Sequence, residues 1–284
     1  MIAITGATGQ LGRLVIAELL KSTPAGSLVA IVRDPAKAAD FTASGVVVRQ
    51  ADYADRASLE AAFAGVAKLL LISSNELGSR ATQHANAIAA AKTAGVSLLA
   101  YTSVLHADRS PLGLAAEHLE TEQILAASGL PYAILRNGWY TENYTGSIPA
   151  ALAHGVLAGS AGAGRISSAA RQDYAEAAAK VLTGSAGTAR IYELAGDESY
   201  TLADLAAEIS KQSGKTVPYQ DLPEADYAAL LLKAGLPSPV AGLIASSDRS
   251  AAEGALFDDS RELSKLIARP TTPLAESVRQ ALLG

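Results

Sequence analysis

Short runs of apolar residues alternate with longer amphipathic stretches over the first half of the chain. Apolar runs of strand length, bounded by turn residues, lie at residues 2–5, 28–32, 46–49, 69–72, 98–102 and 133–135. Helical periodicity separates most of them, at residues 11–21, 35–41, 56–63, 80–94 and 115–127. Strands that alternate with helices pair in parallel, because each helix carries the chain back across the sheet. We therefore expect an α/β fold with a doubly wound parallel sheet.

This alternation ends near residue 137. Gly-, Tyr- and Asn-rich segments follow, and a glycine-rich loop at residues 155–164 precedes a helix at about residues 173–182. A further strand at residues 190–194 is expected to return to the sheet edge. The remaining helical patterns lie at residues 202–213, 224–233, 261–267 and 273–283. We predict a Rossmann-type doubly wound parallel sheet with a smaller, mostly helical C-terminal substrate lobe.

The elements predict two structural parts. Residues 1–142 form the dinucleotide-binding Rossmann domain, to which residues 166–194 return. Residues 143–165 and 195–284 form the substrate-binding lobe. Because ligands of open α/β sheets bind at the carboxyl edge of the strands, we expect the lobe to cover that edge and to form the substrate side of a cleft.

The first predicted strand runs directly into three spaced glycines. Residues 2–12 read IAITGATGQLG, which places Gly-x-x-Gly-x-x-Gly between a buried strand and an amphipathic helix. A tight turn and the close approach of a pyrophosphate both need residues without a side chain, and the helix N-terminus offers N–H groups and the positive end of its dipole. The motif therefore predicts a dinucleotide coenzyme. The candidate contacts in this segment are Gly6, Thr8, Gly9, Gln10, Leu11 and Gly12.

The end of the second strand indicates which coenzyme binds. NAD-specific folds carry an acid there that binds the ribose 2′-hydroxyl, whereas this chain has Arg33. Arg33 and Lys37 are one helical turn apart and can both face a 2′-phosphate. We therefore expect NADPH to bind better than NADH. Asp34 is the alternative ribose ligand, but an acid before Pro35 is better explained as a helix cap.

Further strand ends carry small polar residues that are candidate coenzyme contacts. Asp52 and Tyr53 follow the third strand, where an adenine ring would lie. The alternative for Asp52 is that this acid lies in a turn and caps the next helix. The next two strand ends would point at the nicotinamide, where small residues let a flat ring lie against the backbone. Arg171 is another candidate coenzyme contact. The alternative is that Arg171 forms an ion pair with Asp173 at the surface. The candidates after the fourth and fifth strands are Ser73, Ser74, Asn75, Thr102 and Ser103.

Composition narrows the chemistry. The chain has 284 residues, no cysteine, and four histidines without an i, i+4 pair, so disulfides and thiolate catalysis are excluded and a metal site is disfavoured. A net charge of −5 without a basic cluster argues against nucleic acid or an anionic membrane as a partner. The sequence has no apolar run long enough to span a membrane and no signal-peptide pattern. We expect a cytoplasmic monomer or homodimer that binds neither metal nor flavin.

Several segments resemble the NmrA-like branch of the atypical short-chain dehydrogenase/reductase superfamily. The likeness extends over essentially the whole chain. The residues that carry it are TGATGQLG (5–12), AIVRDPAK (30–37), ADY (51–53), LRNGWYTENY (135–144), DYA (173–175) and YELAG (192–196). The resemblance implies an NADPH-dependent reductase that passes hydride directly to a quinone. Its alternatives are a reductase of triphenylmethane dyes and an NADP(H)-binding redox sensor that regulates a partner.

The chain lacks the Tyr-x-x-x-Lys pair with which the parent superfamily protonates a carbonyl. Alignment on Glu122 places Leu114 and His118 at these two positions. A ketone needs that proton in the transition state, whereas a quinone accepts hydride on an electron-poor ring and leaves a delocalised, weakly basic anion. The missing pair therefore favours quinones and cationic dyes, although a sensor would also lack it. Because Glu117 and Glu120 flank His118, we expect this histidine to be solvated, with proton delivery as the alternative.

The segment after the sixth strand supplies the candidate acceptor site. Asn137 and Tyr140 are the candidate catalytic residues, with Asn137 as a hydrogen-bond donor near the nicotinamide or the quinone oxygen. Trp139, Tyr140 and Tyr144 can form flat walls for an aromatic substrate. Core packing of the lobe is the alternative for these rings.

Overall fold

The protein divides into two compact units. The computed structural model describes residues 1–184 and 189–283. Unit 1 holds the described residues of 1–108, 116–137 and 172–193, and unit 2 holds those of 109–115, 138–171 and 194–284. Among the described residues, no helix is both long and apolar enough to cross a membrane.

The division lies close to the expected parts but differs in four segments. Residues 138–142, residues 166–171 and Leu194 belong to unit 2 instead of the Rossmann domain. The reason is local pairing, because Tyr140 forms a β-bridge with Ala169 and Ile166 forms one with Tyr200. Residues 109–115 also belong to unit 2.

Unit 1 is built around a seven-stranded sheet. The strands are β1 (Ile2–Ile4), β2 (Leu28–Val32), β3 (Val47–Gln50), β4 (Lys68–Leu71), β5 (Leu98–Val104), β6 (Tyr132–Asn137) and β8 (Arg190–Leu194). Their order is β3-β2-β1-β4-β5-β6-β8, and β1 to β6 pair in parallel. The predicted fold class and the return of the last strand to the sheet edge are confirmed. The strand order reverses between β1 and β4, which is where open α/β sheets bind ligands.

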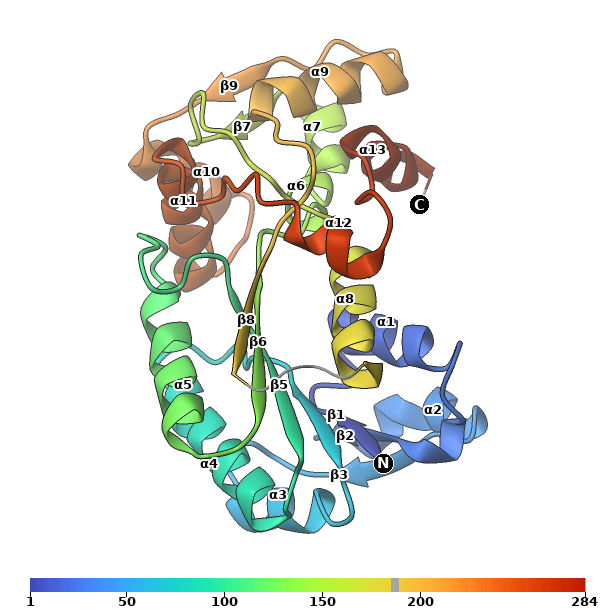
Figure 1. The fold of residues 1–284 in the computed structure, drawn as a ribbon. Coiled ribbons are helices and arrows are strands. Elements are labelled where there is room, and N and C mark those ends of the chain that lie inside the picture. Colours follow the sequence, from blue (N-terminus) through green and yellow to red (C-terminus); the bar gives the residue numbers. More distant parts are fainter. Residues whose placement is uncertain (185–188, 284) are drawn as a thin grey trace. The chain divides into compact units, whose positions relative to one another are not determined.

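Helices cover both faces of this sheet. Figure 1 shows α3 (Arg56–Ala62), α4 (Arg80–Thr93) and α5 (Ala115–Ala127) on one face. The other face carries α1 (Gln10–Leu19), α2 (Ala39–Ala43) and α8 (Arg171–Thr183). Two short 3-10 helices, η1 (Ala25–Ser27) and η2 (Pro35–Ala38), flank β2. Right-handed crossovers between parallel strands produce helices on both faces once the strand order reverses.

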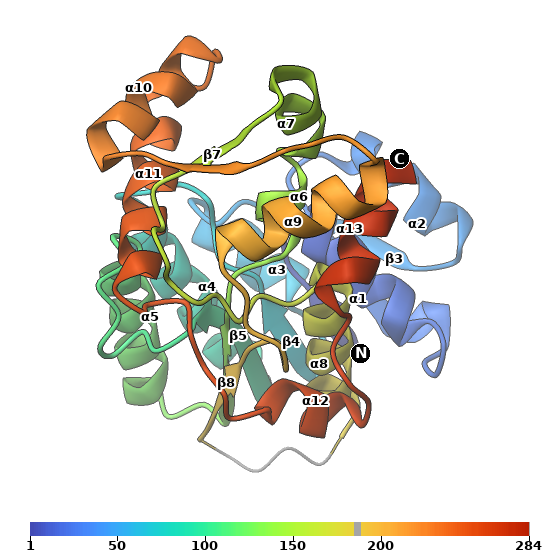
Figure 2. The same cartoon turned by 90° about the horizontal axis from the view of Figure 1, so that it is seen from above.

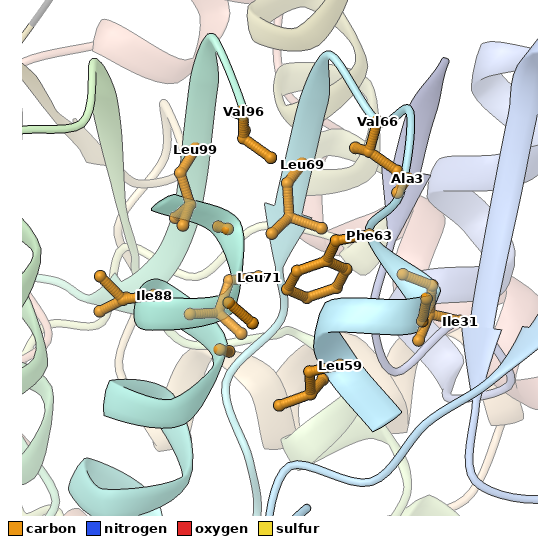
Figure 3. Close-up of a cluster of buried hydrophobic side chains, with 14 of the residues drawn as sticks. Ala3, Ile31, Leu59, Phe63, Val66, Leu69, Leu71, Ile88, Val96 and Leu99 are labelled. Carbon is orange, nitrogen blue, oxygen red and sulfur yellow. The ribbon is translucent and has the colours of Figure 1, made fainter. Parts of the chain in front are cut away.

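A hydrophobic cluster lies between the sheet and the face that carries α3 and α4. Phe63, Leu69 and Leu71 are fully buried in it, and Figure 3 shows the Phe63 ring beside both leucines. All five residues of β2 are buried, as expected of a parallel strand covered on both faces. This packing holds the carboxyl ends of the strands in fixed positions.

Unit 2 is mostly helical. Its helices are α6 (Glu142–Thr145), α7 (Ile148–His154), α9 (Leu202–Ser213), α10 (Glu224–Lys233), α11 (Ser238–Ala252), α12 (Glu262–Ile267) and α13 (Leu274–Leu283). Two short strands, β7 (Leu157–Gly159) and β9 (Tyr219–Asp221), pair in parallel. Figure 2 shows α9 beside α13 and α10 beside α11, in agreement with their contacts.

Helix α11 was not predicted from the sequence. Its buried face consists of small or polar side chains, among them Ala245, Ser247 and Asp248, so it lacks an apolar stripe. Pro239 in its first turn and Gly242 further disguise a helix. Both residue types are more typical of loops than of helix interiors.

Candidate functional site

Unit 1 contains a cavity of about 520 Å³ at the carboxyl ends of β1 to β4. Its volume lies within the range of small-molecule and cofactor sites. Its lining comes from the glycine turn after β1, the ends of β2 and β3, and the loop after β4. It brings together the predicted coenzyme contacts Gly6, Thr8, Gly9, Arg33, Lys37, Asp52, Tyr53, Ser73, Ser74 and Asn75.

The turn after β1 requires glycine at two positions. Gly6 has a φ of +58°, a left-handed conformation that other residues rarely adopt. A Cβ on Gly12 would lie 2.5 Å from the Gly6 carbonyl oxygen and 2.8 Å from Ala7 Cα, so only glycine lets α1 pack against the turn. The N-cap Gly9 has no side chain to bond the first N–H groups of α1. These N–H groups and the helix dipole fit the pyrophosphate of a dinucleotide.

Gln10, Leu11 and Gly12 form the first turn of α1 and do not line the cavity with their side chains. Leu11 and Gly12 are buried against the rest of unit 1. Any contact that Leu11 and Gly12 make with a coenzyme would run through the backbone, whereas the side chain of Gln10 is exposed. Their assignment as coenzyme contacts stays a prediction.

Tyr53 forms an inner part of the cavity wall. Its hydroxyl lies 2.5 Å from Thr5 Oγ1 and 2.7 Å from the Ile72 carbonyl oxygen. Burial raises the pKa of this phenol well above its ordinary value, so the group stays neutral. Asp52 also lines the cavity and accepts a hydrogen bond from the Ala54 N–H at 2.8 Å. The helix cap proposed as an alternative for Asp52 is supplied by Asp55, which accepts from two N–H groups of α3.

Charged side chains lie at the edge of the cavity. Arg33 Nη1 donates to Glu76 Oε1 at 3.0 Å, and Gln83 Nε2 donates to Glu76 Oε2 at 2.6 Å. The side chains of Arg33 and Glu76 are 65% and 47% exposed. Asp34 accepts from the Ala36 N–H and is the N-cap of η2, so the interpretation as a helix cap is confirmed.

Glu76 and Gln83 were not among the predicted site residues. Neither belongs to a motif, and only their position after β4 could have indicated them. The Oε1 atom of Gln83 is buried and has no hydrogen-bond partner among the described residues. Gln83 thus lines the cavity, but its unpaired acceptor atom is itself buried.

Buried side chains hold the loop after β4 in place. The Ser74 N–H donates to His84 Nε2 at 2.9 Å, and the Ser74 carbonyl oxygen accepts from Arg80 Nε at 2.7 Å. His84 Nε2 is thus an acceptor, which places the ring proton on Nδ1, 3.0 Å from Thr121 Oγ1. Burial, and secondly the charge of Arg80, lower the pKa of His84 to about 3. The ring is therefore neutral, and it fixes the backbone that faces the cavity.

Thr102 and Ser103 do not line this cavity. Thr102 Oγ1 accepts a hydrogen bond from the Ser73 N–H at 2.9 Å, so Thr102 helps to hold the loop after β4 in place. Ser103 Oγ donates to Glu122 Oε1, and Glu122 pairs with Arg136 at 2.7 Å. Thr102 and Ser103 are thus part of buried networks, and their contact with a coenzyme stays a prediction.

His118 is not solvated, so the expectation drawn from its neighbours is wrong. The residue is 5% exposed, and its Nδ1 lies 2.7 Å from the Tyr101 hydroxyl oxygen. Burial, and secondly the charges of Arg80 and His84, lower its pKa to about 3, so the imidazole is neutral near pH 7. The charged neighbours Glu117 and Glu120 do not indicate whether His118 is buried, because residues one or two apart lie on different faces of a helix.

Asn137 ends β6 and is 5% exposed. Its Oδ1 atom is buried and has no hydrogen-bond partner among the described residues. A buried polar atom without a partner costs free energy, which a ligand with a donor group could recover. The binding role of Asn137 stays a prediction.

Tyr140 and Arg171 contact each other within unit 2. The guanidinium carbon of Arg171 lies 4.6 Å from the centroid of the Tyr140 ring, a cation–π arrangement. The Arg171 N–H donates to the carboxylate of Glu142. Asp173, the acid of the alternative surface pair, is fully buried. The catalytic role of Tyr140 and the coenzyme role of Arg171 stay predictions.

Unit 2 contains a second cavity, of about 300 Å³. Three aromatic side chains line it, Trp139, Tyr144 and Tyr227, together with apolar side chains and the carboxyl group of Asp248. Trp139 and Tyr144 thus face a cavity, as the hypothesis of flat walls requires, whereas Tyr140 is not part of the lining. Nothing in the spacing of the sequence pointed to Asp248.

Comparison with known protein families agrees with the geometry of unit 1. A family described as NAD(P)H-binding matches residues 6–185, which include the glycine turn and the strand ends around the cavity. The chain belongs to this NAD(P)H-binding family. The match and the cavity together assign dinucleotide binding to unit 1.

Similar proteins narrow the relationship within the NAD(P)H-binding family. The chain is 62% identical to quinone oxidoreductase 2 of Escherichia coli, over 98% of this chain and 97% of that protein. The crystal structure of the NADPH-dependent quinone oxidoreductase of Escherichia coli complexed with NADPH matches with a TM-score of 0.97 and 61% identity, over 100% of both chains. Triphenylmethane reductase of Citrobacter sp. complexed with NADP(H) matches with a TM-score of 0.95 and 40% identity, over 99% of this chain and 100% of that one. The resemblance seen in the sequence is confirmed.

Proposed function

We propose that the protein is an NADPH-dependent reductase of quinones. The observation that carries this proposal is the cavity of unit 1, in which a glycine turn and two cationic side chains face one space. The 62% identity to a quinone oxidoreductase over nearly the whole chain supports the choice of acceptor. The bound coenzyme would supply the hydride, and the chain supplies position and charge.

The residues of the cavity fit a dinucleotide that carries a 2′-phosphate. The uncapped N-terminus of α1 suits the pyrophosphate, and Gly6 and Gly9 leave room for it. The Arg33 guanidinium can bind phosphate oxygens in a bidentate manner, and Lys37 adds a second positive charge. Glu76, which now pairs with Arg33, would compete with that phosphate and would have to release the guanidinium.

The proton chemistry favours quinones as acceptors. Leu114 stands where a tyrosine would donate a proton, and the neutral, buried His118 does not replace it. We propose that Asn137 stabilises the reduced acceptor or positions the coenzyme through a hydrogen bond that its side-chain N–H group donates, since the residue lies at a strand end. A neutral donor is sufficient for a quinol anion and insufficient for an alkoxide.

An acceptor panel tests the proposal. The purified protein is mixed with NADPH and with a benzoquinone, a naphthoquinone or a plain ketone, and the absorbance of the reduced nicotinamide is followed. We expect turnover with the quinones and none with the ketone. Asn137→Ala should lower quinone turnover while NADPH still binds. Tight NADPH binding without turnover of any quinone would contradict the proposal and favour the redox sensor.

A further inference from the structure

Arg13, on α1, binds oxygen atoms from two separate segments of unit 1. Its Nε donates to the carbonyl oxygen of Thr8 in the glycine turn at 3.3 Å. Its Nη2 donates to the carbonyl oxygen of Lys37 in η2 at 2.7 Å, and its Nη1 pairs with Oδ2 of Asp40 in α2 at 2.6 Å. The planar guanidinium has five N–H groups in fixed directions, so it can hold all three acceptors at once. Arg13 therefore joins the glycine turn to the segment that follows β2.

The segment that carries Lys37 depends on contacts of this kind. η2 has four residues and α2 has five, and helices this short are not stable through their own hydrogen bonds. Phe41 of α2 is buried, and the guanidinium carbon of Arg13 lies 5.0 Å from the centroid of its ring, a cation–π arrangement. Removal of the guanidinium would therefore loosen the segment at Lys37.

Two of the residues that Arg13 holds line the cavity of unit 1, whereas Arg13 is not part of the lining. These residues are Thr8 and Lys37. In the proposed function, the turn that contains Thr8 lies beside the pyrophosphate, and Lys37 faces the 2′-phosphate. Both phosphate groups belong to one ligand, so a fixed spacing between the two segments lowers the entropy cost of binding it.

Asp40 gives Arg13 a second effect on Lys37. Residues three apart on a helical segment are neighbours, so the carboxylate of Asp40 can pair with the ammonium of Lys37. In the structure, Arg13 occupies that carboxylate, and Lys37 forms no ion pair with any of the described residues. The charge of Lys37 is therefore left for an anion in the cavity.

We propose that Arg13 is a positioning residue for the 2′-phosphate of NADPH. It holds Lys37 at a fixed place relative to the glycine turn, and it keeps Asp40 from pairing with Lys37. The inference rests on the proposed binding of the 2′-phosphate by Arg33 and Lys37. It adds a residue that favours NADPH over NADH from outside the cavity lining. NADH lacks the 2′-phosphate, so its affinity does not depend on Lys37.

A double-mutant cycle on coenzyme affinity tests the inference. The Kd values of NADPH and NADH are measured on the full chain by fluorescence of the reduced nicotinamide. Arg13→Met keeps an apolar stem and removes the guanidinium, so it should weaken NADPH binding about three- to tenfold and change NADH binding little. Lys37→Met should also weaken NADPH binding. In the Lys37→Met background, Arg13→Met should have almost no further effect, because the residue through which it acts has been removed.

Arg56→Met is the matched control. It removes another exposed arginine of unit 1 that pairs with a carboxylate, and it should change neither affinity. Equal losses of NADPH and NADH affinity in Arg13→Met would overturn the inference, because they would show a general loosening of the glycine turn. Losses that multiply in the double variant would also overturn it, since Arg13 would then act without Lys37.

Arg13→Lys keeps the inference open to refutation if Arg13→Met does not fold. Lysine keeps the charge, but its compact ammonium cannot span the two carbonyl oxygens and the carboxylate. NADPH should therefore bind more weakly to Arg13→Lys than to the unmodified protein, whereas NADH binding should stay the same. Full NADPH affinity in Arg13→Lys would overturn the positioning role. Because every readout is a coenzyme affinity, failure of the inference is distinct from a failure of quinone turnover.

Discussion

The two cavities of the protein are built in opposite ways. The cavity of unit 1 is formed by strand ends and a glycine turn, and it offers backbone N–H groups, Arg33 and Lys37. The cavity of unit 2 is formed by side chains from several helices, from β7 and from the segment before α6, and its charged member is the buried carboxyl group of Asp248. The first offers groups that bind an anion, and the second offers aromatic faces and a carboxyl group. The difference indicates that coenzyme recognition is set mainly by backbone geometry, whereas the ligand preference of unit 2 depends on a few side chains.

The largest expected effect is a difference between the two units in how acid changes their stability. His84 and His118 have pKa values near 3 when folded and near 6.5 when unfolded, so the unfolded state binds more protons between these values. Each histidine should therefore destabilise unit 1 progressively as the pH falls below about 6.5, by on the order of 1 kcal/mol per pH unit. Asp248 acts in the opposite direction, because its folded pKa of about 6 exceeds its ordinary value of 3.8.

Hydrogen exchange at several pH values, corrected for intrinsic rates, would measure this difference strand by strand. His118→Gln should reduce the acid sensitivity of β5 in unit 1, whereas His154→Gln, at an exposed position in unit 2, should not. An unchanged pH slope in His118→Gln would show that this histidine does not titrate as its burial implies.

The next largest effect is expected on the choice of coenzyme, when the Arg33 guanidinium is removed. Arg33→Ala should raise the Kd for NADPH about tenfold to hundredfold, since a bidentate contact with a charged group is lost. The Kd for NADH should change little. Fluorescence of the reduced nicotinamide measures both values, and Arg56→Ala, which breaks an exposed pair with Glu60, serves as the control. Equal effects on both coenzymes would remove Arg33 from 2′-phosphate recognition.

The backbone construction of unit 1 can be tested at Gly12. Gly12→Ala should destabilise the protein by about 1–3 kcal/mol, because the added Cβ meets backbone atoms that no rotamer change can move. Gly26→Ala is the matched control, since a Cβ there meets nothing within 4 Å. Urea unfolding measures both variants. Equal stability of the two variants would show that α1 can shift away from the turn.

The smallest expected effect concerns Glu76, the acid that pairs with Arg33 at the edge of the unit 1 cavity. Glu76→Gln removes the carboxylate that occupies Arg33, so NADPH should bind about two- to fivefold more tightly, in line with the small free energy of an exposed ion pair. NADH affinity should stay the same. Glu60→Gln, in another exposed pair, is the control for net charge. Weaker NADPH binding in Glu76→Gln would mean that this acid contacts the coenzyme.

Much of the fold of unit 1 was predictable, because its elements have clear boundaries in the sequence. β2, β8 and α5 begin and end at the predicted residues. In unit 2, α9 and α10 also match the prediction. Helix α11 does not, because its buried face is small and polar instead of apolar.

The candidate site divides in the same way. The strand-end residues of unit 1 were predictable because parallel strands bring their carboxyl ends to one edge of the sheet. The cavity of unit 2 was predictable only in part, because Trp139 and Tyr144 were expected to form walls, whereas Tyr227 and Asp248 are far away in sequence and join them only in the folded unit. The burial of His118 was missed for a related reason, because sequence neighbours do not show which face of a helix is covered.

The order of the strands also bears on how the protein is made. β8 covers the edge of β6. Residues 138–171, which belong to unit 2, are synthesised after β6 and before β8. A nascent chain that has passed β6 therefore carries an unprotected strand edge until residue 194 has left the ribosome, and such edges readily pair with other chains. A fragment that ends before residue 190 would retain the glycine turn and Arg33 but would expose this edge, so we expect it to aggregate.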